Sequence, residues 1–429
     1  MNFRHLFIFS IFLFSNFSFA VLEVKVIKSD INALPIAVLP FNIKGDFELD
    51  EDIARIIRDD LNRSGRFRAF ANRFILSAKE DVNRINYKKW TSNKIEALVI
   101  GSIENASKGN YKVTFRLFET YTKRQVYGKS WIVRKQSLRK MAHKISDIVY
   151  RELLDEKGAF DTHIAYITVK ENSKGERKYS LEVADSDAQN PQIVLVSKEP
   201  ILSPTWSPDG TKLAYVSFEN GHSEVFIKYV WVRRKREKLP KFDGIASAPA
   251  WSPDGKLMAL TLSKDGNKDI YIYDLSTKKL RRLTTHEDID TESNFSPDSK
   301  KIIFTSNRSG KPNIYTIDIS GGKAERLTYT GNYNAKPVYS PNGKYIALVH
   351  RQFSAYRIGL IDLENNTLSI MSSNTLDESP YFAPNSSMII YATNQGNKGI
   401  LSVISIDGRR SHRLMSTLGE VREPTWSSF

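Results

Sequence analysis

Pro204-Thr205-Trp206-Ser207-Pro208-Asp209-Gly210 is the first copy of a phrase that returns five times before the chain ends. The residue that opens the turn in each copy stands at position 207, 252, 296, 340, 383 and 427, so the successive spacings are 45, 44, 44, 43 and 44 residues. A period near 44 residues matches the length of one four-stranded propeller blade. The repeat therefore predicts a β-propeller in the second part of the chain.

The chemistry of the phrase predicts a strand, a tight turn and a second strand. Ser207, Pro208 and Gly210 suit positions i, i+1 and i+3 of a type I turn. Pro204 is tolerated because a strand can begin with a residue that lacks a backbone donor. Trp206 is large enough to fill the wedge between two neighbouring sheets, so we expect one such aromatic side chain between each pair of blades.

The two ends of the repeat region complement each other. After Phe160 the chain opens with three strand-like segments, 164–169, 179–184 and 193–196, without an aromatic strand before them. The C-terminus supplies an aromatic strand at Pro424-Thr425-Trp426 with no strand after it. An incomplete blade leaves unpaired backbone groups. We therefore predict that residues 158–429 form a six-bladed propeller closed by the C-terminal strand.

Residues 35–157 carry no repeat and predict an α/β domain. Strands are expected at 36–41 and 98–103, and a β-hairpin at 111–133. Amphipathic helices are expected over about 50–63 and 137–154, where apolar residues recur at helical spacing. Nothing in this domain has a catalytic pattern. The predicted fold class is thus an α/β N-terminal domain followed by an all-β six-bladed propeller.

The first 20 residues have the pattern of a signal peptide. Arg4 and His5 precede an apolar run from Leu6 to Phe19, and Ser18-Phe19-Ala20 fits the small-x-small cleavage rule. The run of 14 residues is shorter than the roughly 20 that a spanning helix needs. We expect export with cleavage of residues 1–20, the alternative being an uncleaved anchor.

Residues 21–34 form a separate N-terminal arm. Leu22, Val24 and Val26 alternate with Glu23 and Lys25, which is the pattern of a short strand. The pattern fits an edge strand within the same protein, and it also fits a mobile arm that adds to the sheet edge of a partner. The residues alone leave both interpretations open.

The composition limits the chemistry and raises one further class of partner. The chain has no cysteine, and its seven histidines lie at least 20 residues apart, so the sequence supports no disulfide, cofactor or metal site. The net charge of +15 raises nucleic acid as a partner, and the densest basic run is Arg233-Arg234-Lys235-Arg236 on an outer hairpin of the second blade. Export removes the chain from nucleic acid. A contact of this run with a membrane or an anionic polymer stays open.

Two enzymatic alternatives remain to be weighed. A propeller hydrolase needs a hydrolase domain of roughly 200 residues and a Gly-x-Ser-x-Gly elbow, whereas Gly221-His222-Ser223-Glu224-Val225 lacks the second glycine. A metal-dependent enzyme acting on a small substrate would place its ligands along the propeller channel. This second alternative stays open on sequence grounds.

The order of these parts resembles the TolB family, the periplasmic member of the bacterial Tol–Pal cell-envelope system. The resemblance rests on the signal peptide, an α/β domain that opens with Pro35-Ile36-Ala37-Val38-Leu39-Pro40-Phe41, the six repeats and the closing Pro424-Thr425-Trp426-Ser427. Similar repeats occur in prolyl oligopeptidase-like propellers, so the repeat alone is less specific. The resemblance implies a monomeric, non-catalytic adaptor that supports outer-membrane integrity and constriction in cell division. The implied partners are the outer-membrane lipoprotein Pal, bound by the propeller, and inner-membrane TolA, bound by the arm, with membrane contact only through these partners.

The predicted sites follow from propeller geometry and from this resemblance. The loops that lead into each aromatic strand lie on the face opposite the Ser-Pro-Asp-Gly turns and ring one mouth of the channel. The predicted Pal-binding residues there are Ser247, Ala248, Asp290, Thr291, Glu292, Ala335, Glu378, Ser379, Arg422 and Glu423. The same loops carry Glu199, Glu287, Asp288, Asp377 and Glu420, so we expect an acidic mouth on a basic protein. The resemblance assigns Pal contact to Ala248 and Thr291, whereas Ile245 stands where relatives carry His. It assigns TolA binding to Leu22, Glu23, Val24, Lys25, Val26 and Ile27.

Overall fold

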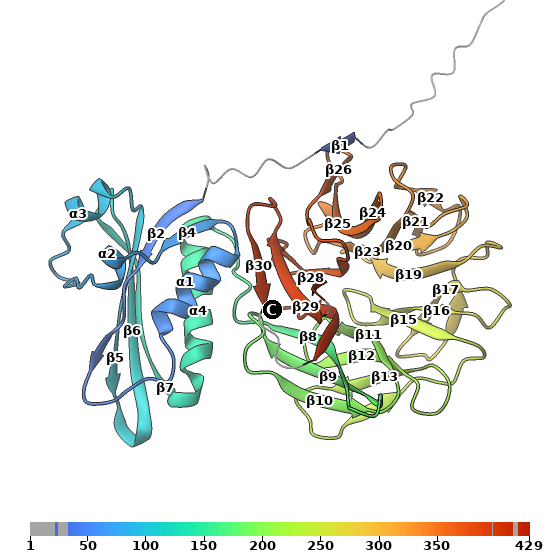
Figure 1. Cartoon of the computed structure of the whole chain (residues 1–429), viewed down its shortest axis with the longest axis horizontal. Coiled ribbons are helices and arrows are strands. Elements are labelled where there is room, and N and C mark those ends of the chain that lie inside the picture. The colour runs from blue at the N-terminus through green and yellow to red at the C-terminus, as the bar shows by residue number, and fades with distance from the viewer. Residues whose placement is uncertain (1–21, 25–32, 397, 415–418) are drawn as a thin grey trace, which may run out of the picture.

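An α/β domain lies beside a ring of β-sheets in the computed structural model, which describes residues 22–24, 33–396, 398–414 and 419–429 (Figure 1). The predicted signal peptide at 1–20 lies outside the described residues, as do Lys25, Val26 and Ile27 of the arm. No helix among the described residues is long and apolar enough to cross a membrane.

The N-terminal domain is built on one mixed sheet. Parallel pairing joins β2 to β4, β2 to β5 and β3 to β5, and antiparallel pairing joins β5, β6 and β7. The strands are β2 (Leu34–Val38), β3 (Asn42–Lys44), β4 (Phe67–Phe70), β5 (Ala97–Asn105), β6 (Asn110–Glu119) and β7 (Arg124–Arg134). The predicted strands and hairpin are therefore present, whereas β3 and β4 were not predicted.

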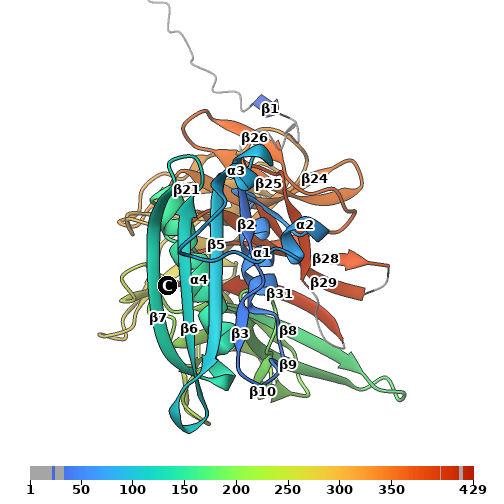
Figure 2. The ribbon, with the colours of Figure 1, turned by 90° about the vertical axis from the view of Figure 1, so that its left-hand side faces the viewer.

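Helices cover both faces of this sheet. The long helices α1 (Ile53–Arg63) and α4 (Leu138–Leu154) lie between the sheet and the propeller, and the sheet faces the viewer in Figure 2. The short helices α2 (Arg73–Leu76) and α3 (Tyr87–Ser92) pack on the other face, where Trp90 is fully buried. Two 3-10 turns, η1 (Ser107–Gly109) and η2 (Lys135–Ser137), flank the hairpin. Helix α1 begins later than predicted because Asp52 caps it, accepting a hydrogen bond from the backbone N–H of Arg55 at 3.1 Å.

Six blades of four strands each make the propeller, with β1 added to the sheet of the fifth, and the predicted blade count is confirmed. The first blade holds β8 (His163–Glu171), β9 (Arg177–Asp185), β10 (Gln192–Ser197) and β31 (Glu420–Trp426). The second and third hold β11 (Ile201–Trp206), β12 (Lys212–Ser217), β13 (Glu224–Tyr229), β14 (Arg236–Lys238), β15 (Ala246–Trp251), β16 (Leu257–Leu262), β17 (Asp269–Asp274) and β18 (Leu280–Arg282). The fourth and fifth hold β19 (Asp290–Phe295), β20 (Lys301–Ser306), β21 (Asn313–Asp318), β22 (Glu325–Arg326), β23 (Asn334–Tyr339), β24 (Tyr345–Gln352), β25 (Ala355–Asp362) and β26 (Thr367–Ile370). The sixth holds β27 (Glu378–Phe382), β28 (Met388–Gln395), β29 (Lys398–Ser405) and β30 (Ser411–Leu414).

The predicted closure of the ring is also confirmed. Strand β31 pairs antiparallel with β8, so that Trp426 lies opposite Ile164. The backbone N–H of Ser427 donates to the carbonyl oxygen of His163 at 2.8 Å. The last strand of the chain therefore completes the first blade.

Four of the repeat turns are each held by their own serine, whereas the fifth copy has Ala383 at this position. The backbone N–H of Gly210 donates to the carbonyl of Ser207 at 2.9 Å, which closes the turn. The Ser207 hydroxyl donates to the Asp209 carboxylate at 2.5 Å and accepts from the N–H of Lys212 at 3.0 Å. The same pair of side-chain contacts occurs at Ser252, Ser296 and Ser340. The repeat is thus conserved within the chain because the turn needs these side chains.

The two domains share one hydrophobic core. Its buried residues come from α1, α4 and the N-terminal sheet, and also from the first and sixth blades, including Tyr166, Met388 and Trp426. At the junction, Asp147 of α4 accepts hydrogen bonds from the backbone N–H groups of Phe160 at 2.8 Å and Asp161 at 3.0 Å. Burial raises the pKa of Asp147 to about 6, although these hydrogen bonds oppose the shift. Because apolar side chains from both domains pack together, we expect the junction to be rigid.

Candidate functional site

A ring of six equivalent residues surrounds one end of the propeller channel. One residue in the first strand of each blade has a left-handed backbone, with φ between 47° and 54°, and a β-bulge follows or includes it. The six are Ser203, Ala248, Glu292, Lys336, Ser379 and Glu423, and all line one pocket of about 130 Å³. Non-glycine residues in this conformation cost roughly 1 kcal/mol or more and persist where the surrounding structure enforces them. This mouth ring is therefore a preorganised feature of the fold.

Hydrogen bonds link the mouth ring from blade to blade. A carboxylate oxygen of Glu292 accepts from the backbone N–H of Lys336 at 3.0 Å. The Lys336 ammonium donates to the Ser379 hydroxyl at 2.9 Å. Glu423 accepts from the backbone N–H of Ser203, which joins the first blade to the second. Five of the six ring residues thus take part in hydrogen bonds to another ring residue.

Lys336 is the one ammonium within the mouth ring. Burial acts to lower the pKa of its side chain, but the carboxylates of Glu423, Glu292 and Glu378 outweigh burial and raise that pKa. Lys336 therefore stays protonated at neutral pH and neutralises part of the negative charge around the channel. The innermost ring carries two carboxylates and one ammonium, so it is less acidic than the loop composition indicates.

The predicted Pal-binding residues fall into three positions along each first strand. Ala248, Glu292, Ser379 and Glu423 belong to the mouth ring itself. The preceding position is occupied by Ser247, Thr291, Ala335, Glu378 and Arg422. Of these, Ala335 is buried and Arg422 is exposed and paired with Glu420 at 2.6 Å. The structure brings nine of the ten predicted residues to the ring or to its neighbouring position.

Asp290 is the tenth, and the expectation that it presents a charge at the mouth is wrong. Its side chain is fully buried and forms an ion pair with Arg308 at 2.7 Å. Asp377, which contributed to the expected acidic mouth, is also fully buried, and burial raises its pKa. Each stands directly before a half-buried residue, Thr291 or Glu378, and successive side chains along an extended chain point to opposite sides.

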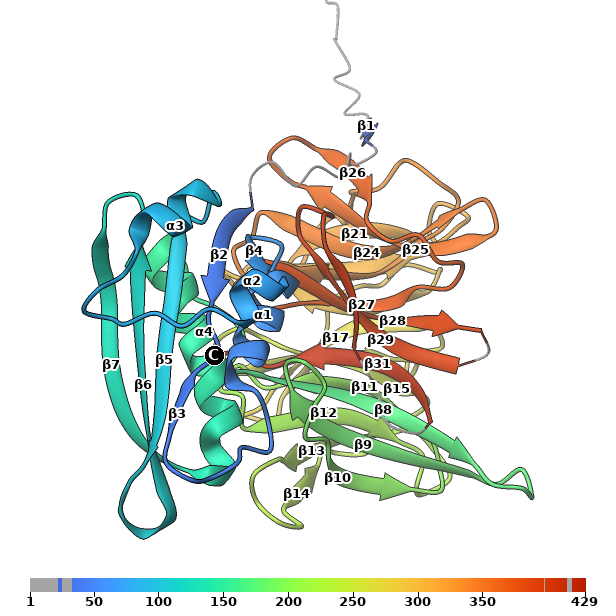
Figure 3. The same ribbon diagram turned by 60° about the vertical axis from the view of Figure 1, so that its left-hand side comes forward.

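The mouth lies away from the N-terminal domain. That domain contacts the propeller at the turn side, where the Asn385 amide donates to the carbonyl of Lys157 at 2.9 Å and Arg139 binds Asp185 at 3.2 Å. Residues of the Ser-Pro-Asp-Gly turns line a second pocket of about 350 Å³ at that opposite end of the channel. Figure 3 shows α1 and α4 against one side of the ring. The mouth ring is therefore left uncovered by the described part of the chain.

The described part of the arm forms a strand on the propeller. Strand β1 (Leu22–Val24) pairs in parallel with β26, the outer strand of the fifth blade, so that Leu22 lies opposite Thr367 (Figure 1). The sequence expectation of a strand at Leu22, Glu23 and Val24 is confirmed at the level of the backbone. The structure shows that this segment is able to extend a sheet edge.

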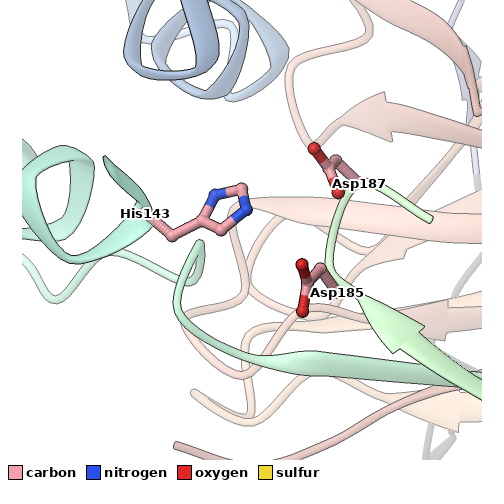
Figure 4. Close-up of side chains that lie close together, drawn as sticks. All are labelled: His143, Asp185 and Asp187. Atoms are coloured by element: carbon pink, nitrogen blue, oxygen red, sulfur yellow. The ribbon is translucent and has the colours of Figure 1, made fainter. Parts of the chain in front are cut away.

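A cluster of possible metal ligands lies between the two domains. Ligand atoms of His143, Asp185 and Asp187 lie within 4.8 Å of one another, with His143 on α4 and both aspartates on the first blade (Figure 4). Arg139 already binds both aspartates and also contacts Glu51 at 2.7 Å. His143 is itself 2.7 Å from Asp60. The cluster is thus an ion network that joins the domains, and the guanidinium supplies the positive charge that a metal would bring.

The network favours the charged form of His143. Burial acts to lower its pKa, but the adjacent Asp60 carboxylate outweighs burial and raises that pKa, with Asp187 acting in the same direction. The sequence did not indicate this network, because Arg139 is separated by 46, 48 and 88 residues from its three partners. Only the fold brings these side chains together.

Comparison with known proteins finds a matching family model for each of the two domains. Residues 22–126 match the model of the TolB amino-terminal domain, and residues 150–429 match that of the TolB beta propeller domain. The chain is 52% identical over 426 residues to the Tol-Pal system protein TolB of Ruthia magnifica subsp. Calyptogena magnifica, covering 99% of each chain. It is 50% identical over 409 residues to that of Nitrosococcus oceani, covering 95% of this chain and 94% of the relative. The crystal structure of TolB from Acinetobacter baumannii superposes with a TM-score of 0.84 at 39% identity, over 92% of this chain and 97% of the other.

Proposed function

The chain belongs to the TolB family of the Tol–Pal system, and we propose that it is a periplasmic adaptor between two partners of that system. TolB proteins are a non-enzymatic component of the system, so the proposed activity is protein binding. The proposed partners are the outer-membrane lipoprotein Pal and inner-membrane TolA. The proposed role is to support envelope integrity and outer-membrane constriction in division. Export through cleavage of residues 1–20 is part of this proposal.

The mouth ring is the proposed Pal site. The observation that carries the proposal is the ring itself, in which six residues share a left-handed backbone and five of them are joined by hydrogen bonds between blades. A rigid site avoids the entropy cost of ordering flexible side chains when a partner binds. The contact residues in this proposal are Ser247, Ala248, Thr291, Glu292, Glu378, Ser379, Arg422 and Glu423, while the buried Asp290 and Ala335 support them. Carboxylates at this site favour basic or hydrogen-bond-donating groups on Pal.

Charge reversal at Glu378 tests the site. Glu378 in β27 of the sixth blade is half-buried beside the mouth ring, and Glu364, in the turn between β25 and β26 of the neighbouring fifth blade, is exposed at the other end of the propeller. Glu378→Lys and Glu364→Lys change the net charge equally. We expect Glu378→Lys to weaken binding of a soluble Pal domain about tenfold by calorimetry, and Glu364→Lys to leave it unchanged. Equal affinity of Glu378→Lys and wild type, or a loss confined to Glu364→Lys, would place the Pal site elsewhere.

The arm is the proposed TolA site. Leu22, Glu23, Val24, Lys25, Val26 and Ile27 would pair with a sheet edge of TolA by strand addition. The pairing of β1 with β26 supports this proposal, because it indicates that the segment adopts a strand against an open sheet edge. Lys25, Val26 and Ile27 lie outside the described residues and enter the proposal by sequence alone.

Deletion of residues 22–27 tests the arm. We expect the deletion to abolish binding of a soluble TolA domain while Pal binding persists, since the mouth lies in other loops. The melting temperature should change little, because β1 is only three residues long. A large loss of thermal stability, or unchanged TolA binding, would show that the segment is a structural edge strand instead.

A further inference from the structure

The outer strand of the first blade is unusual among the six blades. Strand β10 has six residues, whereas the outer strands of the other blades, β14, β18, β22, β26 and β30, have three, three, two, four and four. It pairs with β9 on one side, and no other described strand pairs with its second edge. A long open edge presents a row of unpaired backbone N–H and C=O groups.

Strand β10 also lacks the charges that normally protect such an edge. Its sequence is Gln-Ile-Val-Leu-Val-Ser, and the side chains of Ile193 and Val196 are 58% and 47% exposed. Charged or histidine side chains occur in β14, β18, β22 and β30. The remaining outer strand, β26, is uncharged like β10, and β26 is the one on which β1 adds as a further strand. Strand β10 is therefore the uncharged outer strand that no described segment covers.

A basic hairpin stands next to this open edge. Side chains of β10 and of the β13–β14 hairpin line a groove of about 480 Å³, whose basic members are Lys228, Arg233, Arg234 and Arg236. Figure 3 shows β10 beside β13 and β14 at the lower side of the propeller. Arg236 is paired with Glu219 at 2.7 Å, and the Lys228 ammonium donates to the carbonyl of Val232 at 2.9 Å. The charged groups of Arg236 and Lys228 therefore already have partners within the protein.

Arg233 and Arg234 are different, because both are exposed and no described carboxylate lies within ion-pair distance of either. Trp231 and Val232 on the same hairpin are 51% and 48% exposed. The groove thus combines an unpaired strand edge, exposed apolar side chains and two guanidinium groups without a partner. Guanidinium groups bind carboxylates with two parallel hydrogen bonds.

We propose that this groove binds an acidic peptide segment in extended conformation, paired with β10 and with its carboxylates on Arg233 and Arg234. Backbone pairing supplies affinity in this mode of recognition, and side-chain contacts supply specificity. The open strand edge favours a peptide over an anionic lipid surface. A peptide backbone can pair with both the N–H and the C=O groups of the edge, whereas lipid phosphates only accept hydrogen bonds. The site is separate from the mouth ring and from the arm, so it does not rest on the proposed Pal and TolA sites.

The chain offers a matched control for the arginines. Lys278 and Lys279 occupy the corresponding hairpin of the third blade, and Lys278 shares the left-handed backbone of Arg234. The variants Arg233→Glu/Arg234→Glu and Lys278→Glu/Lys279→Glu therefore change the net charge equally at equivalent places. A third variant, Ile193→Glu/Val196→Glu, places negative charge on the strand itself. Thermal melting of each variant checks that the propeller remains folded.

The probe is a fluorescent octapeptide of alternating aspartate and valine, and its counterpart has lysine in place of aspartate. By fluorescence anisotropy we expect the acidic peptide to bind the wild-type protein and the Lys278/Lys279 variant alike. Binding should fall about tenfold or more in the Arg233/Arg234 and Ile193/Val196 variants, and the basic peptide should not bind. Hydrogen exchange at residues 192–197 should slow when the acidic peptide binds, because the edge amides become paired.

Three outcomes would overturn the proposal. The first is that the acidic peptide does not bind the wild-type protein. The second is that the Lys278/Lys279 variant loses as much affinity for the acidic peptide as the Arg233/Arg234 variant, which would indicate a general charge effect. The third is binding of phosphatidylglycerol vesicles that depends on Arg233 and Arg234 but not on Ile193 and Val196. That last result would assign the groove to a lipid surface.

Discussion

The indole Nε1 of Trp426 donates a hydrogen bond to the Thr162 hydroxyl at 2.8 Å across 264 residues of sequence. Trp426 is 2% exposed and belongs to the core that the two domains share. Thr162 in turn donates to the carbonyl of Ala159 at 2.7 Å in the segment that leaves the N-terminal domain. One contact therefore connects the C-terminus, the first blade and the junction between the domains.

Removal of Pro424–Phe429 should destabilise the whole propeller. The deletion opens the first blade and leaves a cavity in place of the Trp426 side chain, which costs about 3–5 kcal/mol by itself. We expect the melting temperature to fall by about 10 °C. Deletion of Phe429 alone is the control, because this side chain is 56% exposed. Equal melting temperatures for the longer deletion and the wild type would contradict closure by the C-terminal strand.

Local turn chemistry explains why so much of the propeller could be predicted from the sequence. Ser207, Pro208 and Asp209 act within one turn, so a single copy of the repeat is enough to indicate that turn. The same holds for α4, whose apolar spacing runs over 17 residues. Helices α2 and α3, with four and six residues, are too short to display a period.

The bulge in each first strand could not be predicted in the same way. A left-handed backbone is normally indicated by glycine, but the mouth ring holds serine, alanine, glutamate and lysine at those positions. The residue types at these positions therefore do not indicate which side chains turn toward the channel. Asp290 lies next to these positions in the sequence, but its side chain is buried within the blade. The ion network around Arg139 could not be predicted from the sequence, because it depends on how the two domains pack together.

Replacement of Gly158 by alanine should disturb the junction between the domains. An added Cβ would lie 2.2 Å from a carboxylate oxygen of Asp147 and 2.7 Å from its backbone Cα. Relief of this overlap requires movement of α4, which costs about 1–3 kcal/mol. We expect Gly158→Ala to lower the melting temperature, and Lys157→Ala, at an exposed neighbouring position, to have a small effect. A Gly158→Ala protein as stable as the wild type would contradict the tight junction.

His143 should make the stability of the protein depend on pH. Its pKa in the folded protein is raised above the ordinary value of 6.5 by the Asp60 carboxylate, despite burial. The folded state therefore binds the proton more tightly than the unfolded state. The stabilisation that His143 provides is fully present below about pH 6.5 and is lost as the pH rises through the folded pKa.

The variant His143→Gln isolates this contribution. The difference in melting temperature between wild type and His143→Gln should be largest about one pH unit below the ordinary histidine pKa of about 6.5 and should shrink about two units above it. His286→Gln in a half-exposed loop is the control for effects of pH on the rest of the molecule. A difference that grows toward alkaline pH would show that His143 is neutral in the folded protein.

Variants of Asp290 and Glu378 should distinguish a residue that supports the mouth structurally from one that contacts a partner. Asp290 is fully buried and paired with Arg308, whose side chain is 15% exposed. Asp290→Ala removes a charge-assisted hydrogen bond and leaves the buried end of Arg308 without its carboxylate, which costs about 1.5–3 kcal/mol. We expect this variant to melt earlier and to bind Pal with nearly wild-type affinity at temperatures where it is folded. Glu378→Lys should show the reverse, with normal melting and weakened Pal binding, because its side chain reaches the surface beside the mouth ring. If Asp290→Ala melted normally and lost Pal binding, the carboxylate of Asp290 would have to be a contact group, and the assignment of its role to the interior of the blade would be wrong.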